Sequence, residues 1–221
     1  MCNLKKIAGF TVLPVMATRA EYGPALQAMI DPLICGVGPV EAAITLSARL
    51  ATTPNSNQRP DLVISLGSAG SATLEQAAVY QVSHVSYRDM DASAFGFPKG
   101  ETPFLGLPAE IPLAPSVEGL RPARLSTGAN VVSGDAYRTI DADMVDMETW
   151  SIARACHASN IPLIGLRGIS DGAEPVSGYA DWTQYLHIVD ERLADALNGV
   201  EQALADGRID LMAWRPPQNE V

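Results

Sequence analysis

The chain has 221 residues, of which 47% are hydrophobic and 18% are charged. This length suits one domain with a sizeable core, and the composition excludes an intrinsically disordered chain. The formal net charge of −10 argues against nucleic acid or an anionic membrane as partner, but leaves a small anionic ligand open. The three cysteines are odd in number and widely spaced, which suggests a reducing compartment, the cytoplasm. Neither they nor the three histidines show metal-ligand spacing, so we expect no metal and no cofactor.

The first apolar segment, residues 7–17, follows Lys5 and Lys6 and has two interpretations. It resembles a short signal peptide, but a strand buried on both faces of a parallel sheet has the same continuous apolar character. We favour the strand. Beyond this segment, no stretch approaches the ~20 apolar residues of a membrane span.

Short apolar runs then alternate with helical stretches along the chain. The predicted strands are residues 7–16, 33–37, 61–66, 78–87, 123–133, 144–148 and 161–167. The predicted helices are residues 19–29, 39–51, 149–159 and 181–206, with loops at 53–60 and 89–116. Strands that alternate with helices indicate an α/β fold with a mixed, mostly parallel central sheet flanked by helices. We expect a single domain over residues 1–221, with a loosely held tail after about residue 207.

Charged side chains follow two of these strands where each ends. Asp146 and Glu148 come at the end of one strand, and Arg167 and Asp171 at the end of the last. Ligands of open α/β sheets bind at the carboxyl ends of the strands. The sequence therefore predicts a site for a polar, hydroxyl-bearing substrate at this edge.

Five segments resemble, in order, motifs of the nucleoside phosphorylase and nucleosidase family. They are Gly67-Ser-Ala-Gly70, Asp89–Phe97, Val132–Asp135 with Tyr137, Met147-Glu148, and Ser170-Asp171. The likeness runs from about residue 61 to 206, with a weaker match over 7–51, and is closest to the methylthioadenosine/S-adenosylhomocysteine nucleosidases. It implies the nucleoside phosphorylase-like fold and a hydrolase that releases adenine from such a nucleoside.

The resemblance gives two acids catalytic roles. It implies that Asp171 protonates N7 of the leaving purine, which a carboxyl can do when burial raises its pKa. A helix cap after Ser170 is the alternative for this aspartate. Glu21 lies where the nucleosidases bind and deprotonate the attacking water, and an exposed helix acid is the alternative there.

The remaining site residues follow from the same likeness. Glu148 holds the ribose diol with Met147 packed on the sugar, unless Glu148 only opens the next helix. Asp146 replaces the glutamate of the nucleosidases, so its ribose contact is open. Arg167 orients these acids, contacts the sugar or forms an internal ion pair. The base and water contacts come from Ser68, Gly70, Tyr137, Arg138 and Ser170, with Tyr137 stacked on the purine.

The loop over residues 89–116 predicts a homodimer, because its family counterpart enters the 5′-substituent pocket of a neighbouring subunit. The residues concerned are Phe95, Phe97 and Pro103, and a hydrophobic clasp within one chain is the alternative. The 14 residues between Glu21 and Gly36 replace a longer segment that carries a strand pair in the nucleosidases, which leaves the 5′ substituent open.

Water is favoured over phosphate as the nucleophile. Related bacterial phosphorylases carry an arginine three residues before the serine of the glycine turn, and this chain has Ser65 there. Phosphorolysis needs such basic side chains for phosphate. A phosphorylase and a nucleoside-binding protein without catalysis remain the alternatives.

Overall fold

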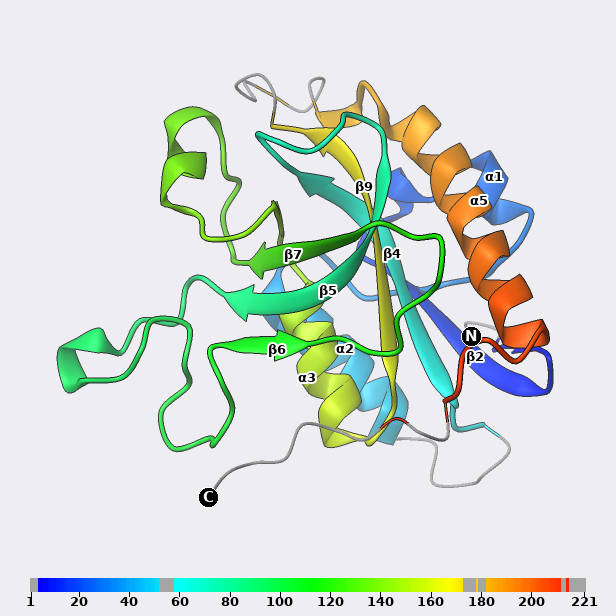
Figure 1. Ribbon diagram of the computed structural model, residues 1–221, viewed down its shortest axis with the longest axis horizontal. Coiled ribbons are helices and arrows are strands. Elements are labelled where there is room, and N and C mark those ends of the chain that lie inside the picture. Colours follow the sequence, from blue (N-terminus) through cyan, green and yellow to red (C-terminus); the bar gives the residue numbers. More distant parts are fainter. Residues whose placement is uncertain (1–3, 52–57, 173–177, 179–181, 212–213, 215–221) are drawn as a thin grey trace.

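The computed structural model describes residues 4–51, 58–172, 178, 182–211 and 214, and it forms one mixed sheet with helices on both faces (Figure 1). The strands are β1 (Lys5–Ile7), β2 (Phe10–Met16), β3 (Leu33–Ile34), β4 (Leu62–Gly70), β5 (Val79–Tyr87), β6 (Glu110–Pro112), β7 (Pro122–Thr127), β8 (Met144–Asp146) and β9 (Leu163–Asp171). The helices are α1 (Pro24–Gln27), α2 (Pro39–Ala51), α3 (Thr149–Ala158) and α5 (Leu186–Ala205). Short 3₁₀ helices cover Arg19–Glu21, Ser93–Phe95 and Gly134–Thr139.

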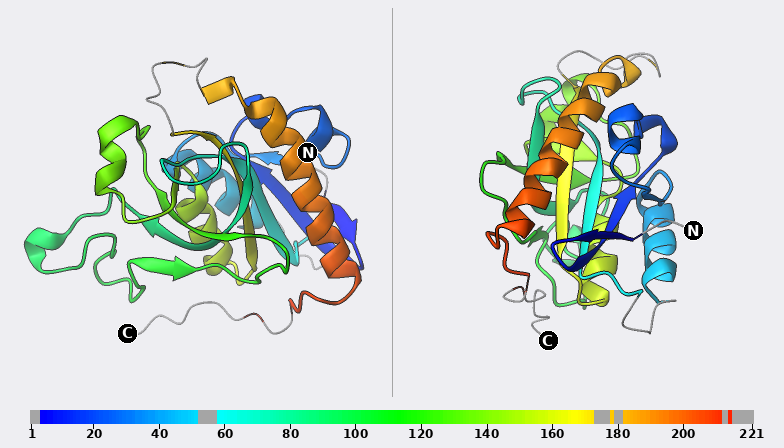
Figure 2. Two further views of the ribbon diagram at one scale, coloured as in Figure 1. Left: turned by 45° about the horizontal axis from the view of Figure 1, so that its top comes forward. Right: turned by 90° about the vertical axis from the view of Figure 1, so that its right-hand side faces the viewer.

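The two faces of the sheet bury different residues of the same strands. In β4, Val63 packs in a cluster with α2 and α3, whereas Leu62, Ile64 and Leu66 pack against α5. Side chains alternate across a strand, so a strand covered on both faces must be apolar throughout. Figure 2 shows α5 on one side of the sheet and α2 on the other. The first apolar run also forms a strand, since β2 pairs in parallel with β4.

Strand pairing brings three strand ends together at Gly70. This residue pairs with Val145 of β8 and with Asp171 of β9. The register between β4 and β9 shifts after Ala69, which leaves Ser170 as an extra residue. Such bulges redirect side chains next to functional sites. The sheet thus positions Asp171 beside the glycine turn.

The predicted α/β class is correct, and the sheet mixes parallel with antiparallel pairs. The predicted strand 7–16 begins only at Phe10, because Ala8 and Gly9 adopt positive φ in the turn that joins β1 to β2 as a hairpin. The predicted strand 123–133 ends at Thr127. The predicted loop 89–116 contains β6, which extends the sheet beside β5.

The predicted helix over 19–29 is wrong as one element. It divides into a 3₁₀ turn and α1 because Gly23 is extended and Pro24 starts a new helix. Asp190 of α5 caps this start: its carboxylate accepts hydrogen bonds from the amides of Gly23, Ala25 and Leu26 at 3.1, 2.8 and 3.2 Å. A buried carboxylate with three donors fixes the chain that leads away from Glu21.

The closing helix α5 is shorter than the predicted 181–206, since its regular part begins at Leu186. After it, Ile209 and Leu211 are buried, so the start of the predicted loose tail is packed. Apart from Trp214, the rest of the tail lies outside the described residues, as does the predicted loop 53–60 up to residue 57. The single-domain assignment stays a prediction. In the described part of the chain, every helix is too short or too polar to cross a membrane.

Candidate active site

A cavity of about 540 Å³ opens at the carboxyl ends of β4, β8 and β9. Four acids and one arginine face it among mostly apolar neighbours. Its described lining consists of Ala17, Thr18, Glu21, Val37, Ser68, Ala69, Gly70, Arg88, Asn130, Val131, Val132, Val145, Asp146, Met147, Glu148, Asp171, Gly178 and Trp182. The predicted acids therefore converge on one space, although they come from distant parts of the sequence.

Glu21 is buried and held on one side only. Its Oε1 accepts hydrogen bonds from the amide and the hydroxyl of Ser68, at 2.7 and 2.5 Å. Its Oε2 is buried and has no hydrogen-bond partner among the described residues. Burial raises the pKa of Glu21, and the two Ser68 hydrogen bonds oppose that shift. The site thus contains a buried carboxylate oxygen with unused acceptor capacity among the described residues.

Asp171 lies over Gly70, as does the hydroxyl of Tyr137. A Cβ at position 70 would come within 2.7 Å of Asp171 Oδ1 and 2.3 Å of the Tyr137 hydroxyl. Glycine is therefore required at position 70 for this close approach. Burial raises the pKa of Asp171, while the Ser170 hydroxyl, 2.7 Å from Oδ2, lowers it. A carboxyl with a raised pKa suits a proton donor.

Glu148 faces the cavity at the N-terminus of α2. Its Oε1 accepts a hydrogen bond of 2.8 Å from the amide of Gly38, which precedes that helix with a φ of +95°. Burial, followed by the charge of Asp146, raises the pKa of Glu148 to about 8. Its predicted role in binding the ribose diol fits this position beside Met147. The glycine turn at 36–38 is thus part of the site, although none of the sequence motifs includes it.

Asp146 is committed to the protein interior. Its side chain is 2% exposed and forms an ion pair of 3.1 Å with Arg167, whose side chain is 3% exposed. The hydroxyls of Thr127 and Thr149 also donate to it. Arg167 donates further to the carbonyl and hydroxyl of Ser65. Of the open alternatives for Arg167, the structure contains the internal ion pair.

Arg88 is a cavity residue that the sequence analysis did not predict. Its guanidinium donates to the backbone carbonyls of Ser126, Asp146 and Asn130, which joins the ends of β7 and β8 to the cavity wall. Burial lowers its pKa. The guanidinium of Arg88 thus holds the backbone around the site in place.

Trp182 is the second unpredicted residue. It lies just before α5, lines the cavity and donates its indole N–H to the Ser68 hydroxyl at 3.0 Å. An aromatic residue near the start of a closing helix is ordinarily core, so the sequence carried no signal for this contact.

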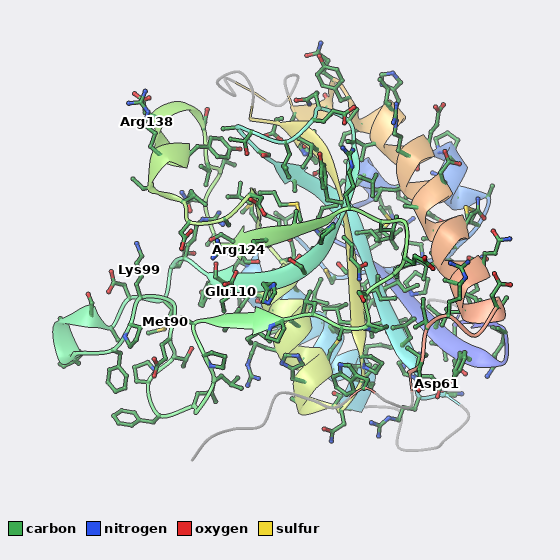
Figure 3. All side chains as sticks on the ribbon, viewed as in Figure 1. Asp61, Met90, Lys99, Glu110, Arg124 and Arg138 are labelled. Atoms are coloured by element: carbon green, nitrogen blue, oxygen red, sulfur yellow. The ribbon has the colours of Figure 1, made fainter. Side chains whose placement is uncertain are left out.

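Several predicted site residues lie away from the cavity lining. The side chain of Arg138 is 82% exposed, pairs with Asp135, and points outward in Figure 3. Phe95 is 84% exposed, and Phe97 meets Phe104 edge-on within the 89–109 loop. This loop, which carries Pro103 and the labelled Met90 and Lys99, extends away from the sheet in Figures 1 and 3. Their predicted contacts with base or partner remain predictions.

No group of three or more His, Cys, Asp or Glu residues in the described chain is placed to hold a metal ion.

A family model described as the phosphorylase superfamily matches residues 33–200. The chain belongs to this superfamily. The family resemblance drawn from the five sequence motifs is thereby confirmed.

One curated relative is similar to the chain in sequence. A 5′-methylthioadenosine/S-adenosylhomocysteine nucleosidase of Haemophilus influenzae (strain PittEE) is 33% identical over 158 residues. That match spans 63% of this chain and 66% of the relative, slightly less than two thirds of its length.

Among solved structures, the Streptococcus pneumoniae nucleosidase of the same name with a transition-state inhibitor has a TM-score of 0.71 at 21% identity. The alignment covers 87% of this chain and 99% of that one. A futalosine hydrolase mutant of Helicobacter pylori gives 0.73 at 20% identity, over 86% and 98%. Both establish the fold. Because their names give different activities, they do not identify the substrate of this chain.

Proposed function

We propose that the protein is a purine nucleoside N-glycosidase that hydrolyses an adenine nucleoside of the methylthioadenosine/S-adenosylhomocysteine type. The observation that carries this proposal is Glu21, which faces the same cavity as Asp171: Ser68 fixes its Oε1, and its buried Oε2 has no hydrogen-bond partner among the described residues. A water-binding base and a carboxyl with a raised pKa are the two groups that such a hydrolysis requires.

In this reaction Asp171 donates one proton and Glu21 accepts another. The bond between C1′ and the purine nitrogen breaks, and its electron pair stays with the base. Asp171 gives its proton to N7 of the departing base. Water forms the new bond to C1′ and gives a proton to Glu21 Oε2. Glu148, beside the ribose, binds the diol, and its ionised form, which prevails above its raised pKa of about 8, stabilises the positive charge that the sugar gains.

Base recognition in this proposal uses Tyr137 stacked on the purine, backbone groups next to Arg138, and Ser170 holding Asp171. The cavity also favours a neutral base such as adenine over an anionic ligand. Among the described residues, its lining contains four acids and one cation, Arg88. Arg88 is already bonded to three carbonyls. Among the described residues, a phosphate nucleophile would find no unoccupied basic side chain in the cavity, because Arg167 is also bonded, to Asp146 and Ser65.

We therefore expect adenine release to be independent of phosphate. The purified protein is incubated with methylthioadenosine, S-adenosylhomocysteine and adenosine, with and without phosphate, and free adenine is followed in a coupled assay. Mass spectrometry should find the free ribose derivative in both buffers. Accumulation of a ribose 1-phosphate derivative would overturn the choice of water, and binding without adenine release would favour a non-catalytic nucleoside-binding protein.

We also propose a homodimer with composite sites, placed in the reducing cytoplasm. The buried thiols of Cys35 and Cys156 are free, which suits that compartment. Three apolar residues at the start of α2 are 54–66% exposed, namely Val37, Val40 and Ile44, and Val37 also lines the cavity. An exposed apolar patch next to a site suits a protein partner, and the exposed loop with Phe95 supplies a matching apolar surface.

Replacing Phe95 with alanine tests the composite site. The ring is 84% exposed within one chain, so its loss costs no internal packing. If the ring enters a partner's 5′ pocket, kcat/KM for methylthioadenosine should fall roughly tenfold more than for adenosine, since a buried aromatic ring contributes more than 1 kcal/mol. Sedimentation velocity reports the dimer. Equal losses for both nucleosides, or a monomeric wild-type protein, would contradict the proposal.

A further inference from the structure

Three polar groups in the cavity form a hydrogen-bond chain with a fixed direction. Trp182 donates its indole N–H to the Ser68 hydroxyl at 3.0 Å, and that hydroxyl donates to Glu21 Oε1 at 2.5 Å. An indole N–H is only a donor, so the serine oxygen must be the acceptor in the first bond. A hydroxyl has one proton, and the indole therefore leaves that proton free for Glu21.

The result is a carboxylate with two different oxygens. Oε1 accepts both donors of Ser68, whereas Oε2 has no hydrogen-bond partner in the part of the chain that the structure describes. We propose that Trp182 is a positioning residue: its N–H orients the Ser68 hydroxyl towards Glu21 Oε1, so that Oε2 is kept as the acceptor of the water proton. This inference rests on the proposed hydrolysis, and adds a residue to it.

The physical reason is competition for the serine proton. Without the indole, the Ser68 hydroxyl is free to turn towards the attacking water and donate to it, which would weaken the nucleophile. Glu21 would also lose one of the two hydrogen bonds that oppose the effect of burial on its pKa. The other charges near Glu21 are Arg167, which lowers its pKa, and Asp146, which raises it, with Glu148 as a further neighbour. Trp182 itself carries no charge, so its replacement by phenylalanine removes none of these charges.

Trp182→Phe isolates the N–H because the aromatic ring remains in the cavity wall. We expect kcat for adenine release to fall about tenfold, the factor for one hydrogen bond of ordinary net strength, with KM changed much less. A base must be ionised, so a higher pKa of Glu21 should move the acid limb of the kcat/KM profile to higher pH. Trp214→Phe is the matched control, since Trp214 stacks on His157 outside the cavity lining. Its profile should match the wild type.

Ser68→Ala decides whether Trp182 acts through the serine. In the Ser68→Ala background, Trp182→Phe should cause no further loss, because the hydroxyl that it orients is gone. The indole N–H resonance of Trp182, identified by its absence in Trp182→Phe, should also shift in Ser68→Ala, a readout that needs no activity.

Additive losses, a wild-type pH profile in Trp182→Phe, or an unmoved indole resonance would each overturn the inference. A wild-type protein that releases no adenine, while the resonance still shifts, would instead refute the proposed function on which the inference rests.

Discussion

Asp171→Asn should lower kcat for adenine release by at least ~100-fold, the range of general acid catalysis. The amide has nearly the shape of the carboxyl and retains a donor, so KM should change little. Asp171 must be protonated to act, and activity should therefore fall in the wild type as pH rises through its raised pKa. The variant should lack this alkaline limb. The measurements are kcat and KM by adenine release across pH.

The matched control is Asp206→Asn, which makes the same chemical change at an exposed residue beside Arg208. It should leave the rate and the pH profile unchanged. Near-normal turnover in Asp171→Asn would remove Asp171 from its proposed role. It would leave the helix-cap interpretation of Asp171 as the better one.

The fold was predictable where short-range pattern decided it. Pro39 fixes the start of α2, because a missing N–H costs nothing in the first turn of a helix, and the helix runs to Ala51 as expected. The continuous apolar run of β4 follows from burial on both faces. The prediction of one helix over 19–29 was wrong because the geometry of this segment depends on Asp190, which caps α1 and is more than 160 residues away in sequence. Local spacing contains no information about such a partner.

The site was predictable where a motif supplies a side chain, and less so where a contact depends on its partner. Glu21, Glu148 and Asp171 face one cavity, as the family resemblance led us to expect. The choice between sugar contact and ion pair for Arg167 required its burial against Asp146, which no spacing reveals. Gly38 contributes a backbone amide and Trp182 an indole N–H, so their residue types alone did not identify them as site residues.

Glu21→Gln should lower kcat by ~10²–10⁴-fold, because it removes the base that takes the proton from water. The effect has a second physical source in this site. Oε1 already accepts two hydrogen bonds from Ser68, so the new amide must direct its NH₂ group towards the water. Glutamine would then donate to the nucleophile where glutamate accepts from it. Substrate binding should survive, since Asp171 and Glu148 are unchanged.

Isothermal titration of methylthioadenosine into Glu21→Gln separates binding from turnover, and Glu75→Gln at an exposed ion pair with Arg121 provides the matched control. Glu21 must be ionised to act, so the wild type should lose activity as pH falls through the raised pKa of Glu21. The variant should lack that acid limb. If Glu21→Gln kept both the rate and the acid limb, the base would be another group. Glu148, whose pKa is raised to about 8, would then be the next candidate in the same cavity.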